Sequence, residues 1–563
     1  MAVLGISCYY HDSAVALIDK QNILFAIHEE RLSRIKHDSR FPTLGISKAL
    51  DYAGIKISDV EEIVFYEDPS VKLNRLWDQA IDGWPHSRRL FYEDLPRFLH
   101  HKFPFAEQVR QHIRYKGPVT FSEHHRSHAA AAFFTSPFER AVVLTLDGVG
   151  EYETATVHIG QGNRLTKIRS IHFPHSLGLF YSIFTQYLGF EVNEGEYKVM
   201  GLAPYGTPRY LDKILGSILH LAEDGSFTLN RKFVDFYSHD KHYSPALIKH
   251  LGVTPRASSE PVLDEHRDLA ASVQKALEIA LAKIIAPLIA EFGIKDFCFA
   301  GGVALNCTAN AQLIRDFGIR SHIHPAAGDA GGALGAAMQS VMRLREKTET
   351  FRYSFSPYLG VNYSERSIQT VLDINNIPHR QSMDLANDIA DQLAEGKVVA
   401  IVHGRDEWGP RALGGRSILA DPRGAEMKDH LNAKIKFREE FRPFAPVIKK
   451  EAYGKWFETL GMQESPYMLY THKALQPSLT GAVTHVDGTS RVQTVSAAQN
   501  PYLYNIIGAF EKRTGVPILI NTSFNLRGEP IVSSPSDALK TFYASGIDTL
   551  AVENYIIEKL PTT

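Results

Sequence analysis

Cysteine is scarce in this 563-residue chain, which has only Cys8, Cys298 and Cys307 and no C-x-x-C pair. This spacing excludes a disulfide framework and a thiolate zinc site, and it fits a reducing, cytoplasmic environment. The chain also lacks an uninterrupted apolar run of the roughly 18 residues that a membrane span needs. Its first residues have no basic segment before an apolar one, so we expect neither a secretion signal nor a membrane anchor.

An excess of either charge is also missing, because the formal net charge is only −2. Nothing in this balance points to a nucleic acid or a membrane surface as a partner. Apolar residues make up 44% of the chain, and the length exceeds what one hydrophobic core usually supports. Polar and turn-forming residues at 345–365 separate two periodic regions, so the sequence predicts domains at 1–350 and 351–563.

Two segments repeat one strand-and-turn pattern. Residues 2–30 read as three short strands with polar turns at Asp-Ser and Asp-Lys-Gln-Asn, and residues 141–170 repeat the pattern with turns at Asp-Gly and at a Gly-rich stretch. Duplicated units of this kind are typical of the two lobes of an ATPase around a nucleotide cleft. Two unrelated hairpins are the alternative.

Helical periodicity follows each repeat. Residues 42–54 and 267–293 space their apolar side chains by three and four and end at glycine. Residues 296–318 predict a buried strand, a Gly-Gly turn and a helix, and the loop holding Asp329 precedes a helix of small residues. Beyond the boundary, helices alternate with short strands, as at 386–404. The fold class is therefore mixed α/β.

Three histidines lie close together in "SEHHRSHAAAAFFTS", residues 122–136. His124 and His128 are four residues apart, so on a helix they share one face and can bind one metal ion. Asp147 ends an apolar strand and Asp329 lies in a glycine-flanked loop, and both would add oxygen ligands. Two nitrogens with two oxygens suit Fe(II), Zn(II) or Mn(II). Polar residues that merely begin a helix or form a turn are the alternative.

The second domain concentrates basic residues in turns. Guanidinium and ammonium groups beside Gly, Pro, Ser or Asn can direct charge and backbone N–H groups at anionic oxygens, which suits phosphate. Surface solvation explains any one of them, but it explains the whole set less well. The set is Arg411, Arg416, Lys434, Arg442 and Arg491.

Taken together, the motifs resemble those of the O-carbamoyltransferases of antibiotic and nodulation-factor biosynthesis. They occur in order over nearly the whole chain, which makes them specific as a group. They are "GISCYYHDSAVAL", "HEERLSRIKHDSRFP", "EHHRSHAAAAFFTSPF", "LTLDGVGE", "GEYKVMGLAPYG", "GGVALNC", "AAGDAGGALGAA", "GPRALGGRSILADPR", "FREEFRPFAPV", "HVDGTSRVQTV" and "NTSFNLRGEPIV".

The resemblance implies an N-terminal domain with the duplicated actin-like (ASKHA, Kae1-like) fold and a C-terminal YrdC-like α/β domain. The C-terminal domain would make carbamoyl-adenylate from carbamoyl phosphate and ATP, and the N-terminal domain would transfer the carbamoyl group to a hydroxyl of a small natural product. It also implies a metal, with iron(II) foremost and zinc or manganese as alternatives, and Mg²⁺ as a further ion with ATP. Oligomeric state stays open.

Roles for individual residues follow from the same resemblance. We expect His11 to be the general base, with Asp12 orienting it or replacing it and Asp235 as another candidate base, and Lys36 to meet the leaving phosphate. His124, His128, Asp147 and Asp329 match the metal-binding pattern. The remaining expected contacts are Gly148, Gly301, Gly302, Asn306 and Asn310 for nucleotide, and the basic set with Asn521 and Ser523 for carbamoyl phosphate and ATP.

Three other functions stay in competition. A tRNA-modifying threonylcarbamoyl transferase is disfavoured by the near-neutral charge, and a hydrogenase-maturation carbamoylase by the missing cysteine-rich zinc segment. An actin-like nucleotide switch without enzymatic activity needs neither the His/Asp set nor a second domain. The acceptor cannot be identified, although the aromatic and basic stretch at 74–103 is a candidate for its pocket.

Overall fold

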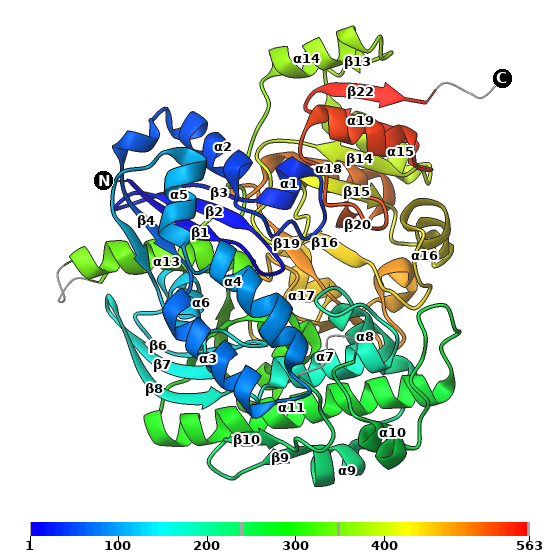
Figure 1. Cartoon of the computed structure of the whole chain (residues 1–563). Coiled ribbons are helices and arrows are strands. Elements are labelled where there is room, and N and C mark those ends of the chain that lie inside the picture. Colours follow the sequence, from blue (N-terminus) through cyan, green and yellow to red (C-terminus); the bar gives the residue numbers. More distant parts are fainter. Residues whose placement is uncertain (1, 237–240, 346–349, 560–563) are drawn as a thin grey trace. The chain divides into compact units, whose positions relative to one another are not determined.

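The computed structural model describes residues 2–236, 241–345 and 350–559, and it divides into two compact units (Figure 1). Unit 1 comprises Met1–Ala26 and Ser39–Phe355, and unit 2 comprises Ile27–Asp38 and Ser356–Thr563. The mixed α/β class is confirmed. The functions assigned to the ranges 1–350 and 351–563 stay predictions.

Two five-stranded sheets in unit 1 share one topology. Their strand orders are β3-β2-β1-β4-β5 and β12-β11-β6-β7-β8. In each sheet the first strand pairs antiparallel with the second and parallel with the fourth, which are β2 and β4 in one sheet and β7 and β11 in the other. The predicted duplication is therefore confirmed. The strands are β1 (Ala2–Ser7), β2 (Ala14–Ile18), β3 (Ile23–His28), β4 (Val60–Phe65), β5 (Val119–Phe121), β6 (Arg140–Leu146), β7 (Glu153–Gln161), β8 (Arg164–His172), β11 (Asp296–Ala300) and β12 (Arg320–Ile323).

Two helices made largely of small residues separate the sheets. Helix α6 (His124–Phe134) packs on β6, β7 and β11, helix α13 (Asp329–Leu344) packs on β1, β2 and β4, and the two helices pack on each other. A Cβ atom at Gly335 of α13 would lie 1.7 Å from the carbonyl oxygen of Ser127 in α6. Glycine is required there because the two backbones touch. The small-residue run after Asp329 thus serves helix packing.

The remaining helices of unit 1 confirm the periodic patterns. Helix α11 extends over 29 residues to Phe292, and both α2 and α11 end at a glycine with positive φ, Gly54 and Gly293. The helices of at least seven residues in this group are α2 (Thr43–Ala53), α3 (Pro69–Asp82), α4 (Leu95–His101), α5 (Phe105–Ile113), α7 (Leu177–Tyr187), α8 (Glu196–Leu202), α10 (Pro245–Leu251), α11 (Asp264–Phe292) and α12 (Cys307–Phe317). No helix in the described ranges is long and apolar enough to cross a membrane.

Unit 2 is built on one mixed eight-stranded sheet of order β13-β22-β21-β14-β15-β20-β16-β19. Successive residues of β14 enter two different cores, because Val399 and Ile401 face one cluster and Ala400 and Val402 face the other. The sheet is therefore buried on both faces. Its strands are β13 (Arg380–Gln381), β14 (Val399–Val402), β15 (Arg416–Ala420), β16 (Ala445–Lys449), β19 (Gln493–Val495), β20 (Ile518–Ser523), β21 (Thr549–Val552) and β22 (Tyr555–Glu558), and its longer helices are α14 (Glu365–Ile374), α15 (Leu385–Ala394), α18 (Pro501–Thr514) and α19 (Pro535–Tyr543).

A short segment from the start of the chain completes unit 2. Residues 27–38 include helix α1 (Glu29–Ser33), where the buried Arg31 donates from Nη2 to the carbonyl oxygen of Gly409 at 2.9 Å. Arg34 donates to the carbonyl oxygens of Pro530 and Ile531 at 2.9 and 2.6 Å. Because the acceptors of these hydrogen bonds are backbone carbonyls, no side-chain pattern in the sequence predicts them. Lys36 therefore belongs to unit 2.

Candidate functional site

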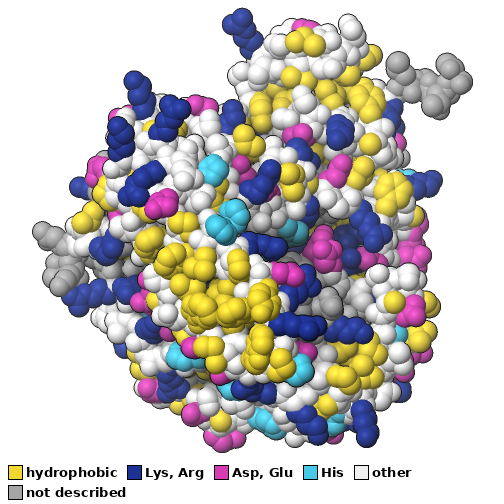
Figure 2. All heavy atoms as spheres, in the orientation of Figure 1, with side chains coloured by type: hydrophobic (Ala, Val, Ile, Leu, Met, Phe, Trp, Pro, Cys, Tyr) yellow, Lys and Arg dark blue, Asp and Glu magenta, His cyan; other side chains and the backbone are white. Residues whose placement is uncertain are grey.

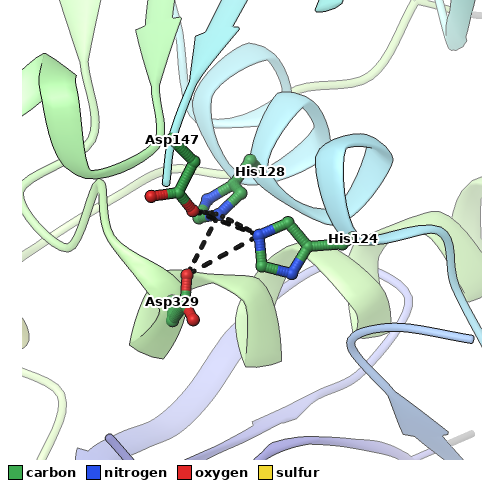
Figure 3. A group of neighbouring side chains, drawn as sticks. All are labelled: His124, His128, Asp147 and Asp329. Atoms are coloured by element: carbon green, nitrogen blue, oxygen red, sulfur yellow. Dashed lines mark hydrogen bonds and ion pairs between the residues drawn. The ribbon is translucent and has the colours of Figure 1, made fainter. Parts of the chain in front are cut away.

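Four side chains converge in unit 1, and they are the four predicted metal ligands (Figure 3). His124 and His128 come from the first turns of α6, Asp147 follows β6, and Asp329 begins α13. One ligand atom from each residue lies within 4.8 Å of the others. The Nε2 atoms of both histidines are 3.1 Å from Asp147 Oδ2, and they are 3.6 and 3.4 Å from Asp329 Oδ1.

The backbone around the cluster fixes these positions. The N–H of His124 donates to both carboxylate oxygens of the buried Glu151, at 2.9 and 3.1 Å, which satisfies one N–H at the start of α6. Gly148 and Gly302 donate their N–H groups to Asp147 Oδ1 at 2.8 and 3.3 Å. Asp147 Oδ1 is therefore held by backbone donors, while Oδ2 faces the histidines.

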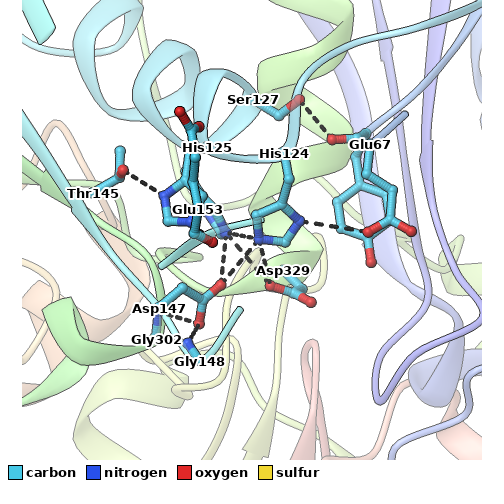
Figure 4. A network of polar contacts seen from close by, with 12 residues as sticks. Glu67, His124, His125, Ser127, Thr145, Asp147, Gly148, Glu153, Gly302 and Asp329 are labelled. Atoms are coloured by element: carbon cyan, nitrogen blue, oxygen red, sulfur yellow. Dashed lines mark hydrogen bonds and ion pairs between the residues drawn. The ribbon is translucent and has the colours of Figure 1, made fainter. Parts of the chain in front are cut away.

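The third histidine of the motif has a different role. His125 lies 2.6 Å from Thr145 Oγ1 through Nδ1 and 2.9 Å from the carbonyl oxygen of Glu153 through Nε2. Both ring nitrogens are thus used by the second sheet (Figure 4). Burial lowers the pKa of His125 well below its usual range, so the ring stays neutral. His125 anchors α6 to the sheet.

The electrostatics of the cluster favour a cation. Burial alone would raise the pKa of Asp147, but the hydrogen bonds from His124 and His128 hold it well below its usual range. Burial opposes a charge on His124, yet the carboxylates of Asp329 and Asp147 raise its pKa to about 10. The two carboxylates thus favour a positive charge at this place, such as that of a bound cation.

The donor set also fits a transition metal chemically. The two Nε2 atoms face each other at 3.1 Å, and the buried Asp329 Oδ2 has no hydrogen-bond partner among the described residues. Facing nitrogens and an unsatisfied buried carboxylate oxygen are costly unless an ion lies between them. Two imidazoles and two carboxylates match Fe(II), Zn(II) or Mn(II) better than Mg(II) or Ca(II).

His11 and Asp12 lie beside the cluster, in the turn between β1 and β2. His11 Nδ1 is 2.9 Å from Asp12 Oδ2, and its Nε2 is 3.7 Å from Asp329 Oδ2. Burial lowers the pKa of His11, but the hydrogen bond to Asp12 and the charge of Asp329 outweigh it and raise the pKa to about 9. The structure thus brings the predicted base to the predicted ligands.

A second layer of charged groups was not foreseen from the sequence. Glu67 is fully buried 3.8 Å from His124 Nδ1, and it forms ion pairs with Lys72, at 2.9 Å, and with Lys102 (Figure 4 shows Glu67). The pKa of Glu67 is held well below its usual range because the two lysine charges outweigh its burial. The available signal in the sequence is weak, because it is only an acidic residue two positions after the apolar strand β4.

The predicted nucleotide contacts divide into two groups. Gly148 and Gly302 serve Asp147, as described, and Gly301 has φ +86° with no room for a Cβ atom against Leu146. Asn306 caps α12 and exchanges two hydrogen bonds with Gln274, and Asn310 donates to the carbonyl oxygen of Ala304. Both asparagines thus have a structural use, and their contact with nucleotide stays a prediction.

Asp235 and Lys36 are the other two predicted catalytic residues. Asp235 is half-buried, and its N–H donates to the carbonyl oxygen of His242 at 2.9 Å. Lys36 lies 3.5 Å from Glu30 within unit 2. Neither residue joins the four-residue cluster of unit 1, and their catalytic roles stay predictions.

Arg416 has a structural environment in unit 2. Its guanidinium is fully buried, forms an ion pair with Asp406 at 2.8 Å, and donates to backbone carbonyls that include those of Ser533 and His403. These partners leave no N–H direction open to a ligand. The geometry does not support the predicted phosphate contact for Arg416.

Lys434 is exposed, whereas Lys436, which was not predicted, is buried. Lys436 Nζ donates to the carbonyl oxygens of Ser523 and Asn525 at 2.8 and 2.9 Å and to Asn525 Oδ1 at 2.8 Å, and it lies 3.4 Å from Ser523 Oγ. One of these partners is a side chain that a ligand can displace, unlike the backbone carbonyls that hold Arg416. Burial, with the nearby charges of Arg438 and Arg442, lowers its pKa well below the usual range. The phosphate contact of Lys434 stays a prediction, and Lys436 is a further candidate beside it.

The rest of the predicted set surrounds Lys436 or stays separate. Arg442 is close enough to Lys436 to affect its pKa, and Ser523 contacts Lys436 directly. Asn521 lies on the same face of β20 as Ser523 and is 1% exposed. Arg411 and Arg491 are half-buried, in the turns after Gly409 and between the short strand Thr489–Ser490 and β19.

Sequence comparisons identify the family. Residues 2–338 match the family described as carbamoyltransferase N-terminus, and residues 390–559 match carbamoyltransferase C-terminus. The chain belongs to the carbamoyltransferase family, in the branch that contains the nodulation and cephem enzymes, and is a transferase.

Individual relatives match along most of the chain. The uncharacterized protein sll1178 of Synechocystis is 42% identical, over 99% of this chain and 96% of the relative. Nodulation protein NolNO of Sinorhizobium fredii is 38% identical over 98% and 79%, and the 3'-hydroxymethylcephem-O-carbamoyltransferase of Amycolatopsis lactamdurans is 30% identical over 96% of both chains. A solved structure of T. kodakarensis HypF covers 61% of this chain and 48% of its own at 14% identity and a TM-score of 0.33, which is too distant to support a functional assignment.

Proposed function

We propose that this carbamoyltransferase is an ATP-dependent O-carbamoyltransferase that works in two steps. Unit 2 makes carbamoyl-adenylate from carbamoyl phosphate and ATP, and unit 1 transfers the carbamoyl group to a hydroxyl of a small natural product. The proposal includes an actin-like unit 1 and a YrdC-like unit 2. The single observation that carries it is the His/His/Asp/Asp cluster beside His11, in a chain whose relatives include a cephem O-carbamoyltransferase.

In the first step, carbamoyl phosphate, ATP and water give phosphate, pyrophosphate and carbamoyl-adenylate. Negative charge gathers on phosphoryl oxygens as pyrophosphate leaves, and fixed cations stabilise it. Lys436 and Arg442 provide such cations beside Ser523, with Arg411 and Arg491 as further candidates. The negative charge of a bound phosphate favours the ammonium form of Lys436, which burial and the neighbouring arginines otherwise oppose.

In the second step, His11 takes the proton of the acceptor hydroxyl while that oxygen bonds to the carbamoyl carbon and AMP departs with the electrons of the anhydride C–O bond. Asp12 accepts from His11 Nδ1, which leaves Nε2 to receive the proton. His124, His128, Asp147 and Asp329 hold the metal. When bound, a divalent transition metal supplies Lewis acidity to the adenylate oxygens, and its charge offsets Asp329 and so lowers the pKa of His11.

The acceptor surface is proposed to involve residues 74–103. Hydrophobic side chains gather over α3 and α4 in Figure 2, and Trp77, Trp84 and Tyr92 on this stretch are between 39% and 68% exposed. Aromatic faces beside basic residues suit a polar, ring-bearing molecule. We propose a sugar or a polyketide-type natural product as the acceptor class.

The test is mass spectrometry of the purified protein with carbamoyl phosphate, ATP and a panel of hydroxylated sugars and ring-bearing metabolites. A carbamoylated product that requires both cosubstrates is expected, without added RNA. A product that forms only when tRNA is present would move the assignment to the tRNA-modifying alternative.

Two lysines two residues apart provide a matched test of the first step. Lys436→Met removes the buried ammonium, and we expect adenylate formation, followed as pyrophosphate release, to fall about 10²–10³-fold. Lys434→Met removes an exposed ammonium from the same segment and should leave the rate within about twofold. Equal effects of the two substitutions would contradict the proposed carbamoyl phosphate site.

A further inference from the structure

Asn521 has an unusual hydrogen-bonding state. Its Nδ2 donates to Gln493 Oε1 at 2.6 Å and to the carbonyl oxygen of Ala412 at 3.3 Å. Its Oδ1 is buried and has no hydrogen-bond partner among the described residues. A buried amide oxygen without a donor is costly, and it calls for a ligand or water that supplies an N–H or O–H group.

The orientation of this amide is set by Gln493. Gln493 Nε2 donates at 2.9 Å to the carbonyl oxygen of Leu413, which can only accept. Gln493 must therefore present Oε1 to Asn521, and Asn521 must present Nδ2 in return. The assignment of nitrogen and oxygen in Asn521 thus follows from a backbone carbonyl.

The backbone carbonyls of Ala412 and Leu413, which accept from Asn521 and Gln493, lie in a turn that is itself held rigidly. Glu407 is buried and its Oε1 accepts the N–H groups of Leu413, Gly415 and Arg416 at 3.0, 2.6 and 3.0 Å. Tyr358 donates its hydroxyl to the carbonyl oxygen of Leu413 at 2.9 Å. The turn that holds Ala412 and Leu413 is therefore fixed before any ligand arrives.

We infer that Gln493 is a positioning residue that turns the Asn521 carbonyl toward the carbamoyl nitrogen, and that this acceptor selects carbamoyl phosphate over acetyl phosphate. The inference rests on the proposed carbamoyl phosphate site around Ser523. The carbamoyl group carries two N–H donors where the acetyl group carries a methyl of similar size. A site with an oriented acceptor rejects the methyl analogue, because the acceptor then stays buried without a partner.

This assignment changes the expected role of Asn521. Asn521 was predicted to contact carbamoyl phosphate, and because both of its N–H groups are directed to protein oxygens, it can do so only as an acceptor. Ser523 Oγ and Lys436 Nζ both donate to Asn525 Oδ1, at 2.7 and 2.8 Å, on the same side of β20. The carbamoyl nitrogen thus has an acceptor in Asn521 Oδ1, and a ligand oxygen that displaces Asn525 Oδ1 would receive the hydrogen bonds of Ser523 and Lys436.

The experiment compares carbamoyl phosphate with acetyl phosphate in ATP-dependent pyrophosphate release by the full chain. Gln493→Met removes both hydrogen bonds of the side chain, so Asn521 can turn over. We expect KM for carbamoyl phosphate to rise about 10-fold and the preference over acetyl phosphate to fall by the same factor, with kcat and KM for ATP little changed.

Gln392→Met is the matched control. Gln392 is also a buried glutamine of unit 2, bonded to Glu558 and Thr549, and it contacts neither Asn521 nor the turn at Ala412. Its substitution should leave the preference unchanged. If Gln493→Met fails to fold, Gln493→Glu still offers an oxygen to Asn521 Nδ2, and it should retain the preference within about threefold while losing the bond to Leu413.

The outcomes separate the inference from the proposed function. An unchanged preference in Gln493→Met, or a preference lost in Gln493→Glu, overturns the role of Gln493. Asn521→Ala tests the site itself, and we expect it to raise KM for carbamoyl phosphate at least as much as Gln493→Met does. An Asn521→Ala variant with normal KM would show that carbamoyl phosphate binds elsewhere.

Discussion

Two turns occupy equivalent places in the duplicated sheets of unit 1 and carry different chemistry. The turn after β1 presents His11 and Asp12, whereas the turn after β6 presents Asp147. Asp329 is approached from both sides, with its Oδ2 3.7 Å from His11 and its Oδ1 3.4 Å from His128. The duplication thus places the proposed base and the proposed metal ligands around the Asp329 carboxylate.

The side chains of the two turns also differ in their contacts and in their exposure to solvent. Asp147 Oδ1 receives two backbone N–H groups and Oδ2 faces two histidines that are each 1% exposed. His11 Nδ1 lies 2.9 Å from Asp12 Oδ2, and 26% and 22% of these two side chains are exposed. These differences fit the proposed roles, a metal ligand in the second turn and a base that meets the acceptor in the first.

Asp147→Asn should have the largest effect, because it removes a ligand charge from a buried site. We expect the metal content of the purified protein to collapse and carbamoyl transfer to fall by about 10³-fold or more, since a metal supplies several kcal/mol of stabilisation. Pyrophosphate release in the first step should persist. Elemental analysis and product assays measure both, and an Asp147→Asn variant with full metal content would remove Asp147 from the ligand set.

His11→Ala should show that the two turns have different functions, because it should reduce carbamoyl transfer without reducing the metal content. Loss of a general base costs about 10²–10⁴-fold in the transfer rate. The metal content should stay at the wild-type level, because His11 lies 3.7 Å from Asp329 and is outside the four-residue cluster. A variant that loses metal and transfer together would make His11 a ligand and abolish the proposed division between the turns.

Gly150→Ala tests the packing of the second turn against the helix. A Cβ atom there would lie 2.8 Å from the Cδ2 atom of His124, so the ring must move, and we expect a 10–100-fold weaker metal affinity, of the order found for disturbed ligand supports. Gly148→Ala is the control, because its Cβ would meet only a methyl of Leu179 at 3.9 Å. Titration with the metal measures both, and equal affinities would contradict the tight fit.

Asp12→Asn should have the smallest effect. An asparagine oxygen can still accept from His11 Nδ1, so only the charge assistance is lost, and we expect transfer to fall about 10-fold. Asp12→Ala removes the acceptor entirely and should cost more. A transfer rate in Asp12→Asn as low as that of His11→Ala would instead make Asp12 the base.

Much of unit 1 could be predicted from local pattern. Strands ending in acidic turns, histidines four apart and glycine-terminated helices each depend on neighbouring residues, and each was found. Glu67 could not be predicted, because its partners Lys72, Lys102 and His124 lie on other elements. A buried ion pair follows from tertiary packing, which leaves little periodic signal.

In unit 2, the local sequence around a basic residue does not indicate whether its side chain is buried or exposed. The basic residues in turns could not be told apart by sequence. In the structure, however, the Arg416 guanidinium is buried among protein acceptors, whereas Lys434 is exposed to solvent. Leu431 and Ile435 are buried and define the inward side of the helical turn at residues 431–436. Lys436 is the residue after Ile435 and is buried on the same side. Residues 27–38 belong to unit 2 through backbone carbonyls, which carry no side-chain signature.

The most direct test of the whole account is X-ray absorption spectroscopy of the purified protein at the edge of its bound metal. We predict a stoichiometric iron, zinc or manganese ion with nitrogen and oxygen neighbours at about 2.0–2.2 Å and no sulfur, and loss of that signal in His128→Ala together with carbamoyl transfer. A wild-type protein that transfers carbamoyl groups without such an ion, or a His128→Ala variant that keeps it, would contradict the account.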